Sequence, residues 1–133
     1  MKETEIQVGD WVRLRYINQL NNQVVIRTFK VHQIRISVFG RYEVWSKERG
    51  NMGDLDRLEP IPLTPEILKK NGFEENEFFS ELKIGEEWRI LCDGRNVAIF
   101  HGEHVNYDNP VCYVHELQHA LRQCHIEKEI FLC

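Results

Sequence analysis

The residues with the clearest catalytic potential are His115, Glu116 and His119, which form the pattern H-E-x-x-H in a segment expected to be helical. Two histidines four positions apart face the same side of a helix and can bind one zinc ion together. The glutamate between them can act as general base on a metal-bound water. His125 lies where extended versions of the pattern place a third ligand. One interpretation is therefore a zinc-dependent hydrolase, with zinc as cofactor, His115, His119 and His125 as ligands and Glu116 as base.

Two features of the same segment favour a helix surface that holds no metal. The extended pattern uses a glycine to turn the chain back, and this chain has Arg122 there. In an unbroken helix ten residues advance about 15 Å, so His125 would not reach an ion held by His115. A third ligand would then have to come from upstream, from His101, His104 or Asp108. The alternative is a polar helix face, with no catalytic residue and no cofactor.

A second chemical feature is a series of arginines and aromatic residues in the first fifty positions. Nine basic groups stand there against five acidic ones, a net charge of +4, although the whole chain carries −4. Guanidinium groups bind phosphate through paired hydrogen bonds, and aromatic rings stack on nucleobases. The sequence therefore predicts a site for an anionic ligand; the alternative is a solvated strand face paired with the acidic remainder. The candidate ligand-binding residues are Trp11, Arg13, Arg15, Arg27, Arg35, Arg41, Tyr42 and Trp45.

The elements that must position this basic series are strands. Residues 8–17 alternate between apolar and polar side chains, which is the period of a half-buried strand. β-Branched residues follow over 24–36, and 37–45 predict a further strand interrupted at a glycine. We expect residues 1–58 to form a small SH3-like β-barrel. Such barrels are common binding platforms, but the fold by itself assigns no ligand.

Residues 59–73 predict an extended connector followed by a short linker helix. The prolines of the connector disfavour helical geometry in the residues that precede them. Thr64 is a favourable helix N-cap, and Pro65 suits the first helical position. Asn71 and Gly72 form a typical helix stop. These signals agree on a helix over 65–71.

Residues 74–133 are expected to form a β-hairpin or small sheet and one C-terminal amphipathic helix. The acidic segment 74–81 predicts a loop. Three strands are expected next, over 87–92, 96–101 and 104–109. A helix is expected over 111–124 because four apolar residues fall on one stripe, namely Val114, Leu117, Leu121 and Cys124. The predicted fold class is therefore α+β.

Composition limits the cellular setting that the sequence predicts. Hydrophobic residues make up 42% of the chain and charged residues 29%, which is globular composition. No apolar run approaches the roughly 18 residues of a membrane span, and the first residues lack the apolar segment of a signal peptide. Four widely spaced cysteines without a C-x-x-C pair predict free thiols in a reducing compartment. We expect a cytoplasmic protein with no membrane partner.

Two stretches carry a family resemblance. They are Glu59-Pro-Ile-Pro-Leu-Thr-Pro-Glu-Ile-Leu-Lys-Lys-Asn-Gly-Phe73 and Tyr113-Val-His-Glu-Leu-Gln-His-Ala-Leu-Arg122. Together with the opening Val8-Gly-Asp-Trp11 they resemble a family of short phage and prophage proteins of gut bacteria, which carries no established catalytic residues. The resemblance implies a phage gene expressed inside a bacterial host cell. It also implies a glycine helix stop in relatives at the position of His125.

Three functions follow as hypotheses. The leading one is a non-enzymatic, phage-type accessory protein that binds a host-made target. The target is a small anionic, nucleotide-like ligand, sequestered as an anti-defence measure, or a host defence protein. We expect such a protein to be a homo-oligomer. The alternatives are the zinc-dependent hydrolase and a nucleic-acid-binding module that uses the basic N-terminal strands.

Overall fold

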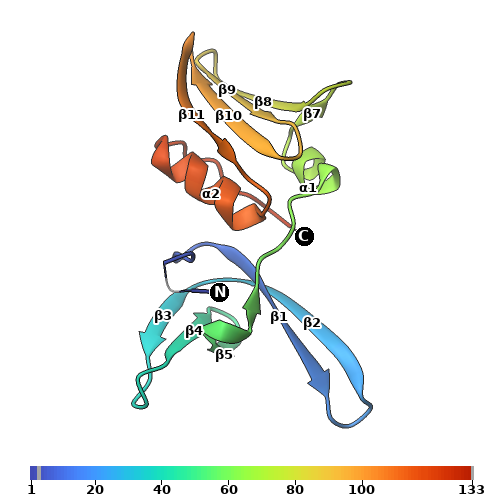
Figure 1. Ribbon diagram of the computed structural model, residues 1–133, viewed down its shortest axis with the longest axis vertical. Coiled ribbons are helices and arrows are strands. Elements are labelled where there is room, and N and C mark those ends of the chain that lie inside the picture. Colours follow the sequence, from blue (N-terminus) through green and yellow to red (C-terminus); the bar gives the residue numbers. More distant parts are fainter. Residues whose placement is uncertain (3, 133) are drawn as a thin grey trace. The chain divides into compact units, whose positions relative to one another are not determined.

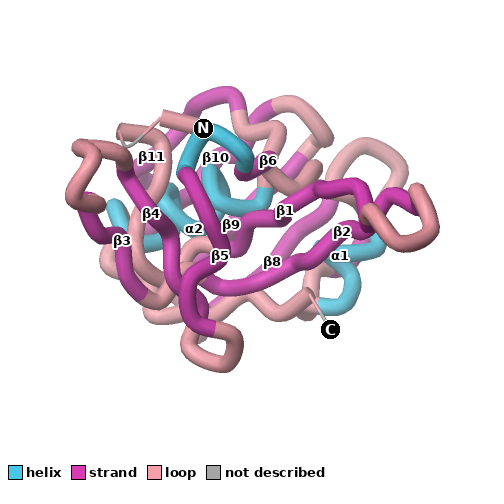
Figure 2. The backbone as a smooth tube through the Cα atoms, turned by 90° about the horizontal axis from the view of Figure 1, so that it is seen from below, coloured by secondary structure: helices cyan, strands magenta, loops and turns pink. Residues whose placement is uncertain are grey.

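The computed structural model describes residues 1–2 and 4–132 of the chain. Within these residues the protein is mostly β-strand, with two α-helices, as Figure 2 shows in magenta and cyan. The α+β class predicted from the sequence is confirmed. The chain divides into two compact units, Met1–Ile61 and Pro62–Cys133, and each is described by itself below.

The N-terminal unit contains two antiparallel sheets of three strands, ordered β2-β1-β6 and β3-β4-β5 (Figure 1). A single turn of 3₁₀-helix, Leu55–Arg57, precedes the last strand. Because no closed barrel is found among the described strands, the SH3-like interpretation stays a prediction. The strands are β1 (Trp11–Asn18), β2 (Gln23–Lys30), β3 (Gln33–Ile36), β4 (Tyr42–Ser46), β5 (Gly50–Asp54) and β6 (Leu58–Glu59).

The alternation predicted for the first strand is present, and it builds the core of this unit. Val12 is fully buried and Leu14 is partly buried, while Arg13 and Arg15 project from the opposite face. The hairpin partner β2 contributes the buried ring of Phe29 to the same core. Each such side chain adds roughly 1.5–3 kcal/mol of hydrophobic stabilisation. The core consists of Ile6, Val12, Phe29, Val31, Val44, Leu55 and Leu58.

The C-terminal unit is a five-stranded antiparallel sheet, ordered β11-β10-β9-β8-β7, and two helices. Helix α2 lies along one face of this sheet (Figure 1). The hairpin and the third strand predicted from the sequence are confirmed. The strands are β7 (Glu74–Glu75), β8 (Ser80–Ile84), β9 (Trp88–Cys92), β10 (Asn96–His101) and β11 (His104–Pro110). The helices are α1 (Pro65–Lys70) and α2 (Val114–Gln123).

The short helix α1 confirms its sequence signals. The Thr64 hydroxyl accepts a hydrogen bond from the backbone N–H of Ile67 at 3.2 Å, as an N-cap should. At the other end Gly72 has φ = 91°, and the N–H of Phe73 donates to the carbonyl of Leu68 at 3.0 Å. That bond and the left-handed glycine define a Schellman helix stop.

Two predictions for the C-terminal unit are wrong. The acidic segment over 74–81 contributes β7 and the start of β8 instead of forming one loop. The last helix begins at Val114 instead of 111, because the preceding residues are held in extended geometry. The Cys112 carbonyl accepts from the N–H of Leu63 at 2.9 Å, and Tyr113 forms an isolated β-bridge with Pro62. The predicted apolar stripe of this helix is nevertheless buried throughout.

Asn71 fixes the C-terminal tail to helix α1, a role that the sequence did not reveal. Its side-chain nitrogen donates to the carbonyls of Ile67 and Phe131, both at 2.8 Å. Its side-chain oxygen accepts from the N–H of Phe131 at 2.7 Å. The buried amide thereby pairs with the tail as a neighbouring strand would. The sequence predicted a tail or strand after residue 125; the described part, to Leu132, has no regular secondary structure.

Candidate functional site

The two histidines of the H-E-x-x-H pattern lie together on α2, one helical turn apart. The ring centroids of His115 and His119 are 5.5 Å apart, and the ring planes meet at 81°. The ring of Tyr113 stacks on His115 with centroids 6.0 Å apart. Among residues 1–2 and 4–132, no group of three or more histidine, cysteine, aspartate or glutamate side chains is arranged to hold a metal ion.

Glu116 is bound to the backbone at the start of α2. Its Oε1 atom accepts hydrogen bonds from the N–H groups of Cys112, at 3.0 Å, and Tyr113, at 3.1 Å. As the third residue of the helix, it occupies the position where a glutamate reaches back to unsatisfied N–H groups and interacts favourably with the helix dipole. The proposed general base of the zinc interpretation therefore has a structural role that accounts for its position.

His125 lies beyond the helix and forms its stop. It has φ = 57°, in the left-handed region, and its side chain is exposed. Its N–H donates to the carbonyl of Arg122 at 3.0 Å, and the N–H of Ile126 donates to that of Leu121 at 2.9 Å. This is the same Schellman stop that Gly72 forms after α1, made here with a residue that pays a steric cost for the conformation.

The arginines of the basic series occupy different faces. In the β1–β2 hairpin, Arg13 lies opposite Thr28 and Arg15 opposite Ile26, so these four side chains share one face. Arg27 lies opposite Leu14 and therefore points to the other face of the sheet. The hairpin separates the predicted ligand-binding residues Arg13 and Arg15 from Arg27.

The remaining predicted residues lie on the second sheet of the N-terminal unit. The guanidinium of Arg35 stacks 4.2 Å from the centre of the Trp45 ring, a cation–π contact. Arg41 is highly exposed and lies 3.6 Å from a carboxylate oxygen of Asp54. Tyr42 lies opposite Ile36, on the face away from Trp45. The eight predicted residues are thus spread over several surfaces and do not surround one site.

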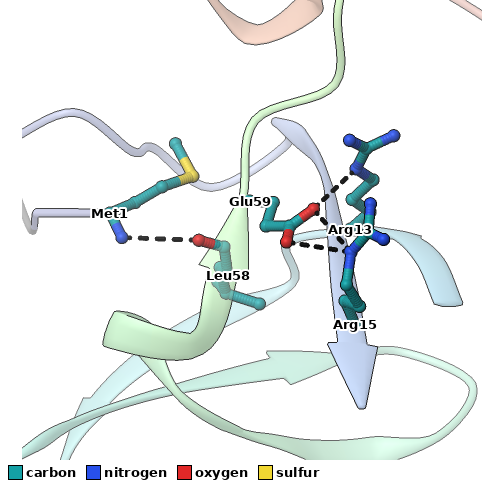
Figure 3. A network of polar contacts seen from close by, with 5 residues as sticks. All are labelled: Met1, Arg13, Arg15, Leu58 and Glu59. Atoms are coloured by element: carbon teal, nitrogen blue, oxygen red, sulfur yellow. Dashed lines mark hydrogen bonds and ion pairs between the residues drawn. The ribbon is translucent and has the colours of Figure 1, made fainter. Parts of the chain in front are cut away.

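Arg13 and Arg15 are joined by a residue that the sequence analysis missed, Glu59 on β6. The Nε atom of Arg13 donates to Oε2 of Glu59 at 3.0 Å, and Nε of Arg15 donates to Oε1 at 3.1 Å (Figure 3). Strand β6 brings the carboxylate there because Glu59 pairs with Arg13 in the sheet. Nothing in the sequence marked Glu59 as the partner of these arginines, because it opens the Pro-rich segment predicted as a connector.

Each guanidinium uses its Nε–H for this contact, and its two terminal nitrogens remain. Among the described residues, none accepts a hydrogen bond from those terminal nitrogens. A guanidinium has five N–H donors in a planar fork, so one edge can hold Glu59 while another binds an anion. We call Arg13, Arg15 and Glu59 the arginine clamp. Its side chains are between a quarter and a half exposed.

The electrostatics of the clamp keep its carboxylate ionised. Partial burial raises the pKa of Glu59, but the hydrogen bonds and charges of Arg15 and Arg13 outweigh it and hold the pKa below its ordinary value. On the same face, the Lys30 ammonium lies 5.7 Å above the Trp11 ring. This face thus carries three cations, Arg13, Arg15 and Lys30, and one carboxylate, Glu59. The excess of positive charge favours an anionic ligand.

A hollow of about 160 Å³ in the C-terminal unit is a second candidate site. Cys92 lies in its wall, and burial together with the nearby Asp93 carboxylate raises the pKa of this thiol to about 12. A thiol with that pKa is protonated and unreactive at neutral pH. The rim carries Glu75 and Glu77 beside the highly exposed Phe78. This hollow therefore lacks the cationic groups that an anion would need.

Cys92, Cys112 and Cys124 are free thiols, and Cys133 lies outside the described residues. Within the described part of the chain, none of the helices is long and apolar enough to span a membrane. No family model, curated protein or solved structure matches the chain.

Proposed function

We propose that this protein is a non-enzymatic binding protein that captures a small anionic, nucleotide-like ligand through the arginine clamp. Arg13 and Arg15 would contact the phosphate end of the ligand, and Glu59 would hold both arginines in place. On this proposal the protein is a phage-type accessory protein, acting as a homo-oligomer in the host cytoplasm and sequestering a host-made ligand. The SH3-like interpretation of the N-terminal unit belongs to the same proposal.

The observation that carries the proposal is the geometry of the two Nε contacts to one carboxylate. Because both arginines are held by Glu59, little side-chain freedom is left to lose when an anion binds. Charge-assisted hydrogen bonds to phosphate are about twice as strong as neutral ones, and arginine can make them in pairs. The terminal nitrogens of the two guanidinium groups lie on one face of the sheet, and together they would form a preorganised binding surface for a phosphate group.

The role of Glu116 supports the non-enzymatic part of the proposal. A general base needs a carboxylate oxygen directed at its reacting water. In this protein one oxygen of Glu116 accepts two backbone hydrogen bonds at the helix start. The helix stop at His125 also accounts for the third histidine without a metal.

Thermal unfolding in the presence of a panel of cyclic and linear nucleotides, with pyrophosphate as a minimal probe, tests the proposal. A ligand at a hundred times its Kd adds about 2.7 kcal/mol of stability, which corresponds to a rise in Tm of about 5–10 °C. We expect such a rise for the wild type and for Arg27→Gln, the matched control on the opposite face. The double variant Arg13→Gln/Arg15→Gln should show none.

Three outcomes would contradict the proposal. One is a wild-type Tm that no probe raises, which leaves a protein partner as the target. Another is an equal rise in the double variant, which places the anion elsewhere. The third is binding of single-stranded RNA or DNA alone, falling steeply with salt, which supports the nucleic-acid module instead.

A further inference from the structure

The far half of the β1–β2 hairpin is a ribbon of only two described strands. Strand β6 pairs with β1 at Arg13 and Leu14 alone. Beyond those residues, β1 and β2 continue to pair with each other as far as Asn18 and Gln23. An isolated two-stranded ribbon is at best marginally stable in water. We call this segment, residues 15–27, the hairpin arm.

The hairpin arm exposes several apolar side chains that usually pack against another element. Ile17 is 63% exposed, Val24 57% and Ile26 48%, and all three lie on the face that also carries Arg15. Leu20, in the connecting turn, is 96% exposed. Contiguous apolar surface of this kind usually marks a site of protein association.

The outer edge of β2 over Gln23–Ile26 lacks the features that protect the two edges of the five-stranded sheet. At one edge of the five-stranded sheet, β7 is only two residues long and both are glutamate. At the other edge, β11 carries a register shift opposite Ile99 and Phe100 and ends at Pro110. Short length, charge, bulges and proline are the usual devices that prevent edge-to-edge pairing. Strand β2 has eight residues, an unbroken register, and no charge or proline between Gln23 and Ile26.

We propose that β2 pairs antiparallel with β2 of a second copy of this chain, about a two-fold axis at Val25. In this register Val25 lies opposite Val25 of the second copy. Val24 lies opposite Ile26, so the exposed apolar side chains meet across the interface. Gln23 lies opposite Arg27, which places an amide oxygen within reach of a guanidinium. A six-stranded sheet across two copies would result.

The complementarity of β2 with itself favours a second copy over an unrelated strand. A two-fold axis makes each contact twice, so a matched pair on one side is matched again on the other. A register centred on Ile26 would instead make the two Arg27 side chains diagonal neighbours on one face, about 7–8 Å apart. Centring on Val25 separates these like charges and aligns apolar with apolar residues.

In the proposed dimer, Val25 of one copy faces Val25 of the other. The test therefore introduces a charged residue at this position. We expect wild-type protein to sediment at twice the mass of the chain. Val25→Glu and Val25→Lys, each alone, should weaken the dimer at least about 100-fold, since two like charges face each other in the interface. An equimolar mixture of the two variants should recover the dimer, because Glu then faces Lys.

The control variants are Val38→Glu and Val38→Lys, in the turn between β3 and β4, where Val38 is 95% exposed and the same charges lie outside the proposed interface; both should remain dimeric. Circular dichroism and anion binding by the arginine clamp should be unchanged in all four variants, which separates this test from that of the proposed function. A monomeric wild type, a dimer insensitive to either Val25 charge, or no recovery on mixing of folded variants overturns the proposal. If the single variants unfold and their mixture does not recover a folded dimer, the proposal is equally overturned.

Discussion

Glu59 and Glu116 each accept hydrogen bonds from two donors, and they differ in what those donors are. Glu116 holds two backbone N–H groups, which have no further hydrogen to offer a ligand. Glu59 holds the Nε–H groups of Arg13 and Arg15, which keep their terminal nitrogens. The first glutamate completes the start of a helix, and the second, on our proposal, holds two arginines in place for an anion.

This difference is the reason that we assign a structural role to Glu116 of the H-E-x-x-H motif and propose the ligand site at an ordinary strand pair. The spacing of H-E-x-x-H does place His115 and His119 side by side. The spacing of Arg13 and Arg15 also places them on one face. The two regions differ in the hydrogen-bond donors that each carboxylate binds. The spacing of residues in the sequence does not predict these donors.

The largest expected effect is on the arginine clamp. Arg15→Lys and Arg15→Gln should both weaken anion binding about 10- to 100-fold, because a hydrogen bond between charged groups contributes about 1.5–3 kcal/mol. Lysine should not substitute for arginine, since one ammonium cannot hold Glu59 through Nε and bind phosphate through a separate edge. Isothermal titration of the nucleotide with the largest Tm effect measures this. Unchanged affinity of Arg15→Lys for the nucleotide would show that only the positive charge matters and would contradict the role of the arginine clamp.

The next effect concerns the start of α2. Glu116→Ala should lower the free energy of unfolding by about 1–2 kcal/mol, because two N–H groups lose their acceptor. Glu116→Gln keeps an acceptor oxygen and should lose less than about 0.5 kcal/mol. Urea unfolding of the three proteins gives both differences. Equal stability of Ala and Gln variants, together with a zinc-dependent activity lost in both, would reverse the comparison between the two glutamates.

A smaller effect is expected at the two helix stops. His125→Gly should stabilise the protein by about 0.5–1 kcal/mol, since glycine adopts φ = 57° without steric cost. Gly72→Ala should destabilise it by about 1 kcal/mol through its φ of 91°, although the added Cβ would meet Leu82 at an ordinary 3.5 Å. Thermal unfolding shows whether each substitution raises or lowers the Tm. A loss of stability and of bound zinc in His125→Gly would make this histidine a ligand.

The smallest effect is the pH dependence of the clamp. The folded-state pKa of Glu59 is lowered, so its ionised form stabilises the fold above the ordinary glutamate pKa of about 4.3. That contribution is lost as the pH falls through the folded-state value. The stability difference between wild type and Glu59→Gln should therefore be constant near neutrality and disappear in acid. A difference that instead grew below pH 4 would contradict the assigned partners.

The sequence predicted those elements whose signals are local. Helix α1 was predicted because Thr64, Pro65 and Gly72 lie within one short segment and act on their own backbone. The hairpin of β9 and β10 was predicted from its Asp-Gly turn for the same reason. Helix α2 was placed three residues too early, because its true start depends on Leu63 and Pro62, which hold the preceding residues extended.

The candidate site was predicted only in part, because it depends on pairing between distant strands. Arg13 and Arg15 were identified from their alternation, but Glu59 is more than forty residues away and joins them only through β6. Composition suggested one cluster of arginines. In the structure, the register of β1 and β2 places Arg27 on the opposite face from Arg13 and Arg15. Arg35 and Arg41 belong to the second sheet of the unit, on β3 and directly before β4.

Arginine side-chain NMR gives the most direct test of the central claim. The Nε–H signals of Arg13 and Arg15 should be resolved, because both protons are held by Glu59, and they should shift together and saturably as the nucleotide is added. The signal of Arg27 should stay unchanged. Saturable binding that leaves the Arg13 and Arg15 signals in place, or that shifts all arginines alike, would contradict the account.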